Sequence, residues 1–242
     1  MARTALFVID IQVELADNAT TEIPHAERIR RAGTGILQKT RQVIDTASEH
    51  GRAQDLEIVF VQHEQVAENG PLVKGSKPWE LVFKPRENNK WERLVSKDVR
   101  DTFESNPQLA AQLKKEGVDT IVAFGIQSEC CVLSTCRSAL ASGFNVILLR
   151  GAHSTYDIDD KAADAIEGEV ESQLEGAGAK GFCRCVRCYK LHVASFQGDS
   201  ANKHGTDHLM IAIYPSPSYH GMSGLTETIV KCIGMIPGQL GG

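Results

Sequence analysis

Short apolar runs that alternate with helix-patterned segments are the feature that most constrains the fold of this chain. The runs are apolar without interruption, which is typical of strands buried on both faces of a parallel sheet. The segments between them carry apolar residues at helical spacing, so we predict right-handed β-α-β units. The expected class is α/β, with three α-β-α layers around a mostly parallel, doubly wound sheet. The expected strands are 4–9, 57–62, 120–124 and 145–149, and the expected helices are 26–50, one between 105 and 117, 131–142 and 159–175.

Residues 64–95 fit neither pattern and contain several glycines and prolines. Long ordered loops within compact domains are often functional. The aromatic residues of this segment, Trp79 among them, are equally compatible with a lid over a binding site and with ordinary packing. We therefore expect this segment to be irregular and to shape any pocket.

Charge and hydropathy exclude several classes of protein. The net charge of the 242 residues is -5, which gives no electrostatic footprint for nucleic acid or an anionic membrane. The longest apolar runs fall well short of the ~20 residues that span a bilayer, and the first run is too short for a signal peptide. We expect a cytoplasmic protein that acts on a small molecule and binds neither nucleic acid nor membrane. Its seven cysteines, an odd number, favour free thiols.

Two residues are predicted to lie where an open parallel sheet binds its ligands, beyond the carboxyl ends of the strands. Asp10 directly follows the first strand, and Cys131 follows the third strand at the start of a helix. The positive end of a helix favours a thiolate, and its free N–H groups can receive an oxyanion. From these features alone, a buried apolar cysteine and a helix-capping aspartate remain open alternatives.

Three separated motifs occur in order along the chain. The first is an apolar strand that ends in Asp-x-Gln (Ala5–Gln12), the second surrounds Lys97 (Val95–Phe103), and the third surrounds Cys131 (Gly125–Val132). In these motifs residues 5–180 resemble the isochorismatase-like cysteine hydrolases, a superfamily that includes nicotinamidases and N-carbamoylsarcosine amidohydrolases. The resemblance implies homo-oligomers, which are common among family members.

The resemblance also implies a catalytic triad of Asp10, Lys97 and Cys131. Cys131 would attack a carbonyl-type carbon, Asp10 would shuttle the proton, and Lys97 would favour the thiolate. The family's cis peptide maps to Ile126–Gln127, which with Cys131 would form the oxyanion hole. The predicted function is therefore hydrolysis of a small amide or carbamoyl-type C–N bond, other than a peptide bond, through a thioester.

Further residues are assigned by their place in or near these motifs. Gln12, His63, Trp79 and Phe103 are the predicted substrate contacts. Nicotinamidases carry metal ligands just after the second strand, but this chain has only His63 there. We therefore predict no metal and no cofactor. Two alternatives remain: a non-catalytic binding or scaffold protein on the same fold, and an isochorismatase-type hydrolase of a vinyl ether.

The C-terminal segment differs in character from the rest of the chain. We assign residues 1–180 to the hydrolase domain and 181–242 to an atypical, poorly ordered tail. One interpretation is an artefact of the gene model, such as a retained intron or a frameshift. Another is a zinc site made by Cys183, Cys185, Cys188 and His192.

Overall fold

The computed structural model describes residues 2–179 of the chain. The expectations for the tail 181–242, including its poor order and the zinc ligands Cys183, Cys185, Cys188 and His192, lie outside the described residues.

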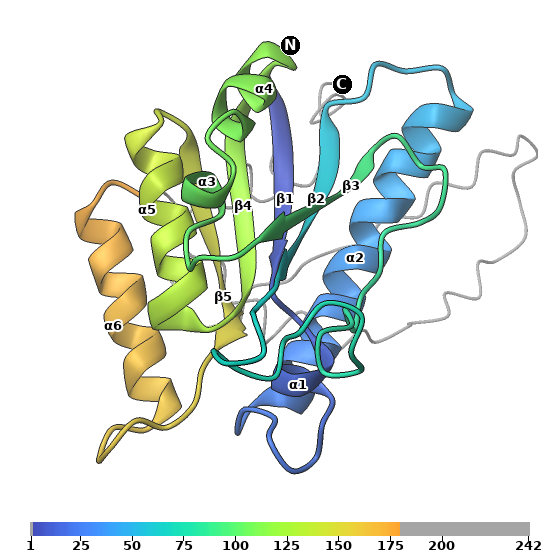
Figure 1. The fold of residues 1–242 in the computed structure, drawn as a ribbon. Coiled ribbons are helices and arrows are strands. Elements are labelled where there is room, and N and C mark those ends of the chain that lie inside the picture. The colour runs from blue at the N-terminus through green and yellow to red at the C-terminus, as the bar shows by residue number, and fades with distance from the viewer. Residues whose placement is uncertain (1, 180–242) are drawn as a thin grey trace, which may run out of the picture.

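Residues 2–179 form a five-stranded, fully parallel sheet between the helices (Figure 1). Its strand order is β3-β2-β1-β4-β5. The chain therefore leaves β1 in one direction to build β2 and β3, and returns on the other side to build β4 and β5. This confirms the doubly wound parallel sheet. The strands are β1 (Arg3–Ile9), β2 (Leu56–His63), β3 (Glu92–Lys97), β4 (Val118–Ile126) and β5 (Asn145–Ser154).

Helices cover both faces of the sheet and complete the three-layer α-β-α fold (Figure 1). The long helix α2 (Ala26–Glu49) and the short α1 (Val13–Ala16) lie over one face. The other face carries α3 (Thr102–Ser105), α4 (Leu109–Lys115), α5 (Leu133–Ala141) and α6 (Ala163–Gly176). No helix within residues 2–179 has the length and apolar character needed to cross a bilayer.

Strand β1 shows why the first apolar run has no alternation. Ala5, Phe7 and Ile9 point into the core under α3–α6, whereas Leu6 and Val8 point into the core under α2. Successive side chains of a strand face opposite sides of a sheet, so a central strand needs apolar residues at every position.

Two predicted boundaries differ from the structure. Strand β3 lies partly within the segment expected to be irregular: it is an edge strand with Leu94 and Ser96 exposed, so it gives no continuous apolar run. The helix expected between 105 and 117 is α4, which begins at Leu109, and the short α3 before it has no counterpart in the prediction. Asp101 begins α3, because its carboxylate accepts a hydrogen bond of 2.9 Å from the N–H of Phe103.

Candidate active site

The ends of β1 and β4 are shaped to bring two loops together at one edge of the sheet. Asp10 follows β1 with a left-handed φ of 50°, which turns the chain away from the sheet. Gly125, which pairs with Ile9 across the sheet, has φ 144°, and a Cβ there would lie 2.0 Å from the carbonyl oxygen of Ile9. Glycine is therefore the residue that lets β4 approach β1 this closely.

Lys97, the last residue of β3, lies at the centre of this edge. Its Nζ is 2.8 Å from Asp10 Oδ2 and 3.2 Å from Cys131 Sγ, and it also donates to the carbonyl oxygen of Val99 at 3.1 Å. Asp10 and Lys97 are 1% and 2% exposed, so their charges pair almost without water. The structure thus brings together the three residues predicted as a triad.

Burial and charge set the resting protonation of these groups. Burial by itself would lower the pKa of Lys97, but Asp10 and Cys131 outweigh it and the pKa is raised, so the ammonium is stable. Burial, followed by the charge of Asp10, raises the pKa of Cys131 strongly, against the opposing effect of Lys97. The resting site therefore holds a thiol, in contrast to the thiolate expected from a helix start.

The position of Cys131 explains that difference. It lies inside a π-helical turn, η1 (Ser128–Val132), that precedes α5, and not at the exposed first turn of a helix. A buried thiol needs a base to remove its proton. The Asp10 carboxylate, whose charge and hydrogen bond to the thiol both raise the pKa of Cys131, is available as that base.

The turn η1 also commits some of its backbone donors. The peptide between Ile126 and Gln127 is cis, as the resemblance implied. The carbonyl oxygen of Gln127 accepts hydrogen bonds from the N–H groups of Cys130 and Val132, at 3.2 and 3.1 Å. These two N–H groups therefore hold the turn and do not face a ligand.

His63 joins the site through the register of β2 and β3, because it pairs directly with Lys97. Its Nδ1 is 3.1 Å from Lys97 Nζ. Burial, followed by the charge of Lys97, lowers the pKa of His63. The imidazole is therefore neutral at pH 7, and its Nδ1 accepts a hydrogen bond from the ammonium.

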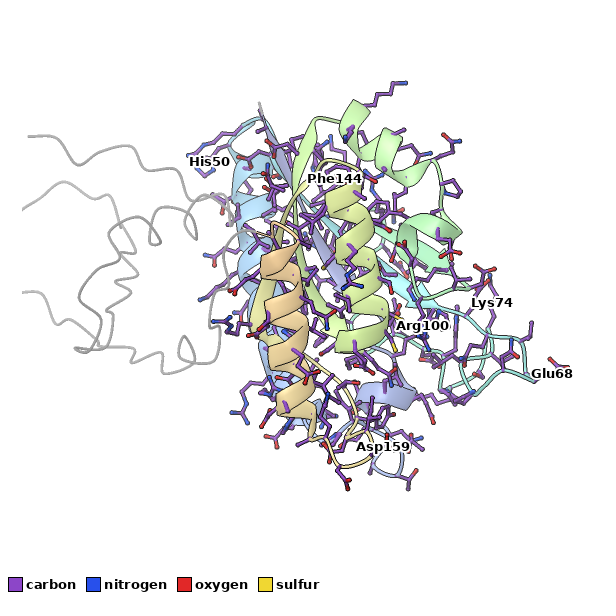
Figure 2. All side chains as sticks on the ribbon, turned by 90° about the vertical axis from the view of Figure 1, so that its left-hand side faces the viewer. His50, Glu68, Lys74, Arg100, Phe144 and Asp159 are labelled. Carbon is purple, nitrogen blue, oxygen red and sulfur yellow. The ribbon has the colours of Figure 1, made fainter. Side chains whose placement is uncertain are left out.

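A pocket of about 260 Å³ lies beside Asp10 and Cys131. His63 and Gln127 line it, and two charged residues, Glu14 and Arg100, do so as well. Arg100 is exposed and lies toward the same side of the molecule as Lys74 and Glu68 of the segment between β2 and β3 (Figure 2). Glu14 and Arg100 were not predicted. Their one signal in the sequence is proximity to Asp10 and Lys97, which surface charges commonly share.

Three of the four predicted substrate contacts do not line this pocket. Gln12 is fully buried, and its amide bridges β2 to the following segment by donating to the carbonyl oxygens of His63 and Trp79, at 2.9 and 2.8 Å. Phe103 stacks on Phe7 in the core, with ring centroids 5.9 Å apart. Trp79 is not among the lining residues, so His63 alone of the four lines the pocket.

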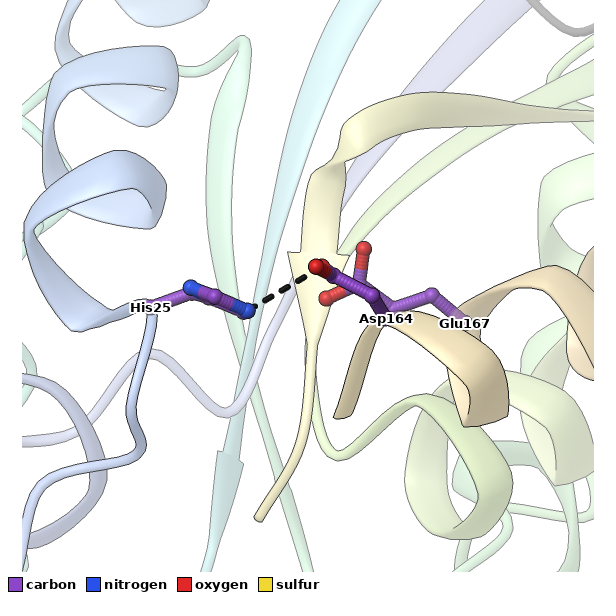
Figure 3. A group of neighbouring side chains, drawn as sticks. All are labelled: His25, Asp164 and Glu167. Carbon is purple, nitrogen blue, oxygen red and sulfur yellow. Dashed lines mark ion pairs between the residues drawn. The ribbon is translucent and has the colours of Figure 1, made fainter. Parts of the chain in front are cut away.

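Residues 2–179 contain one cluster with three potential metal ligands, and it lies away from the pocket. His25, Asp164 and Glu167 meet between the start of α2 and the start of α6, where His25 Nε2 is 3.0 Å from Asp164 Oδ1 (Figure 3). The Arg28 guanidinium is 2.5 Å from Glu167 Oε1 and occupies that carboxylate. A guanidinium already pairs with one of the two carboxylates, so we assign no metal to the cluster.

Sequence comparisons relate the chain to known proteins. Residues 4–169 match the model of the isochorismatase domain family. A streptothricin hydrolase of Streptomyces noursei is 33% identical over 178 residues, which cover 73% of this chain and 63% of that relative. An uncharacterized isochorismatase family protein of Bacillus subtilis, YddQ, is 28% identical over 170 residues, 67% of this chain and 84% of that protein. The match thus spans less than two thirds of the streptothricin hydrolase.

Solved structures share the fold. An isochorismatase-like hydrolase from Alkaliphilus metalliredigens aligns with a TM-score of 0.59 and 24% identity, over 75% of this chain and 92% of that one. A pyrazinamidase of Pyrococcus horikoshii in complex with zinc aligns with a TM-score of 0.54 and 24% identity, over 74% and 97%.

Proposed function

The chain belongs to the isochorismatase domain family, and we propose that it is a cysteine-dependent hydrolase of small amides or carbamoyl compounds. The observation that carries this proposal is the contact of one buried ammonium, Lys97 Nζ, with Asp10 at 2.8 Å and with Cys131 at 3.2 Å. An acid–base group, a nucleophile and a fixed cation are the parts that acyl transfer requires.

In the first half of the reaction, Asp10 takes the proton of the Cys131 thiol while the sulfur attacks the substrate carbonyl carbon. The C–N bond then breaks, and Asp10 returns that proton to the leaving nitrogen. The products of this half are the free amine and a thioester on Cys131. Lys97 keeps its proton throughout and stabilises whichever of its two partners carries the negative charge.

In the second half, water attacks the thioester. Asp10 removes one proton from the water, and the proton then passes to the departing Cys131 sulfur. The C–S bond breaks, the acid product leaves, and the thiol is restored. This order needs a protonated resting thiol and an ionised Asp10, in line with the raised pKa of Cys131.

The negatively charged oxygen that forms in each half of the reaction needs a hydrogen-bond donor. The N–H groups of Cys130 and Val132 are committed to the carbonyl oxygen of Gln127. We assign the oxyanion to the N–H of Cys131, at the cis-bonded turn of Ile126 and Gln127.

Metal independence is part of the same proposal. In the wall of the pocket, His63 Nδ1 is 3.1 Å from the Lys97 ammonium, and a metal ion would have to displace that ammonium to bind this nitrogen. We expect wild-type activity to survive exhaustive treatment with a chelator. Loss of activity that added zinc restores would contradict metal independence.

We also propose a cytoplasmic location and self-association, which the sequence and the family support.

The proposal is tested by a screen of small amides, imides and carbamoyl compounds. Streptothricin is included because a 33% identical relative is named for its hydrolysis. Cys131→Ser is compared with Cys130→Ser, a matched control because both cysteines are half-buried and line the pocket. We expect Cys131→Ser to lose at least about 10³-fold in kcat, and Cys130→Ser to stay within a few-fold of wild type.

Equal activity of the two variants would contradict the assignment of Cys131 as the nucleophile. If instead a vinyl ether were hydrolysed and Cys131→Ser retained that activity, the isochorismatase-type alternative would replace the proposal. A protein that hydrolyses none of the compounds, and whose Cys131 is not alkylated by iodoacetamide even at about pH 10, would favour the scaffold alternative.

A further inference from the structure

A line of buried polar side chains lies behind the turn that carries Cys131, and the proposed mechanism does not use it. Ser128 is the first residue of η1, His153 lies near the end of β5, and Glu171 belongs to α6. Ser128 and His153 are fully buried. Neither can touch a substrate in the pocket.

The distances connect these residues into one chain of contacts. Ser128 Oγ is 2.8 Å from His153 Nδ1, and His153 Nε2 is 3.4 Å from Glu171 Oε1. Glu171 Oε2 is in turn 2.6 Å from Arg150 Nε. The contacts therefore run from the nucleophile's turn to the outer helix α6.

The direction of the protons follows from the last member. Burial alone would raise the pKa of Glu171, but His153 and Arg150 outweigh it and the pKa is lowered, so Glu171 is a carboxylate that accepts only. The Glu171 carboxylate favours the His153 tautomer that has its proton on Nε2, the nitrogen 3.4 Å from Glu171 Oε1. His153 Nδ1 is then left to accept the hydroxyl proton of Ser128, which fixes the rotamer of that serine.

We propose that Ser128, His153 and Glu171 are positioning residues that hold η1 so that the Cys131 sulfur and N–H face the substrate. The inference rests on the proposed function, since it takes Cys131 as the nucleophile. Ser128 lies three residues before Cys131. Gln127, which directly precedes Ser128, has the carbonyl oxygen that accepts hydrogen bonds from two N–H groups of the turn. Releasing Ser128 lets the turn shift, and a displacement of about 1 Å at the reacting atom costs about 10²-fold in rate.

The chain contains a matched control for this network. Ser154, the next residue of β5, donates to Glu167 of α6 at 2.6 Å, and Glu167 also pairs with Arg28 (Figure 3 shows Glu167). Ser154 is fully buried and bonded to a carboxylate of the same helix, one turn before Glu171. Its hydroxyl is bonded to α6 and not to η1, so Ser154→Ala removes a comparable buried hydrogen bond without releasing the nucleophile's turn.

The experiment compares Ser128→Ala, Ser128→Thr, Glu171→Gln and Ser154→Ala in the full-length protein. For each variant it measures kcat, KM, the melting temperature and the rate at which iodoacetamide alkylates Cys131. We expect Ser128→Ala and Glu171→Gln to lose about 10- to 100-fold in kcat, with KM within about 2-fold of wild type. Ser128→Thr restores most of kcat because it keeps the hydroxyl. Ser154→Ala loses stability to a similar extent but keeps kcat.

Wild-type kcat in both Ser128→Ala and Glu171→Gln overturns the inference, and so does an equal loss of kcat in Ser154→Ala. If Ser128→Ala fails to fold, Glu171→Gln and Ser128→Thr decide between these outcomes. The alkylation rate needs no substrate, so it tests the position of Cys131 even where no amide is turned over. Full activity of Cys131→Ser is a separate result, which removes the proposed function itself.

Discussion

Cys130 and Cys131 are neighbours that both line the pocket, yet the 3.2 Å contact with Lys97 Nζ belongs to Cys131. The π-helical turn separates the two sulfurs. The Cys131 sulfur contacts Lys97, whereas the Cys130 sulfur lies by Glu129. Burial, then the charge of Glu129, raises the pKa of Cys130, whereas at Cys131 the charge added to burial is that of the proposed base. The pKa of each thiol thus depends on the carboxylate beside it, which is Glu129 for Cys130 and Asp10 for Cys131.

The raised pKa of Cys131 predicts the pH dependence of its alkylation. An ordinary cysteine has a pKa of about 8.5, so its reaction rate levels off above that pH. The rate at Cys131 should instead keep rising about tenfold per unit from about pH 7 to pH 10, because the thiolate stays a minor species. Iodoacetamide labelling followed by peptide mapping measures this rate. Cys136, fully buried with its pKa raised to about 12 by burial, should stay unlabelled in the folded protein. A plateau for Cys131 below pH 7 would show a preformed thiolate instead.

At this scale the sequence predicts the site unevenly. Asp10, Lys97 and Cys131 are found because motifs fix their places at strand ends. The sequence does not show that the side chains of Gln12 and Phe103 turn to the interior. A residue just past a strand or a helix start can face either the core or the pocket. Proximity to Lys97 does not single out Arg100, because charged residues are ordinary on surfaces.

At the scale of elements, the edge strand β3 and the segment before it depend on one buried carboxylate. Glu92, whose side chain is fully buried, accepts hydrogen bonds from Arg41 of α2 at 2.8 Å and from the Arg86 backbone N–H at 2.9 Å. The irregular segment is therefore tied to α2 where it enters β3. Periodicity could not reveal this, because β3 alternates like an edge strand and its anchor is an ion pair between distant residues.

Glu92→Gln should destabilise the fold. Burial alone would raise the pKa of Glu92, but its bonds to Arg41 and Arg86 outweigh burial and lower it. Its contribution is therefore present above the unfolded pKa of about 4.3 and is lost as the pH falls through the lower folded value. We expect a loss of about 3 kcal/mol in the free energy of unfolding at pH 7, measured by urea denaturation. Below about pH 4 the difference between the variant and wild type should shrink.

Glu27→Gln is the control for Glu92→Gln, because Glu27 forms an exposed pair with Arg31 within α2. It should leave the unfolding curve nearly unchanged. A Glu92→Gln variant as stable as this control would contradict the anchoring role.

At the scale of the whole molecule, the strand order β3-β2-β1-β4-β5 decides where the site lies. The order reverses between β1 and β4, so the connections that follow these two strands run to opposite faces of the sheet and leave a crevice. Asp10 and Cys131 follow these two strands, and Lys97 reaches the same edge from β3. This part follows from alternating strands and helices and from right-handed crossovers, which is why the sequence predicts it well. The shape of the pocket depends on the long segment after β2, whose path local rules do not determine.

The proposed self-association can be tested at strand β3. Leu94 and Val99, 48% and 38% exposed, are large apolar residues on β3, an edge strand within residues 2–179, and just after it. Light scattering should give at least twice the chain mass of 26.4 kDa. Leu94→Glu should shift the mass toward that of one chain if the β3 edge is the contact. A wild-type mass of 26.4 kDa at all concentrations would contradict self-association.

The most direct test of the central claim is the mass of the enzyme during turnover. The protein is mixed with an amide that it hydrolyses, quenched in acid within milliseconds to seconds, and analysed as intact protein and as peptides. A covalent route through Cys131 predicts a mass increase equal to the acyl group, located on Cys131, present in Cys130→Ser and absent in Cys131→Ser. Turnover at full rate by Cys131→Ser, or an acyl group on any other residue, would contradict it.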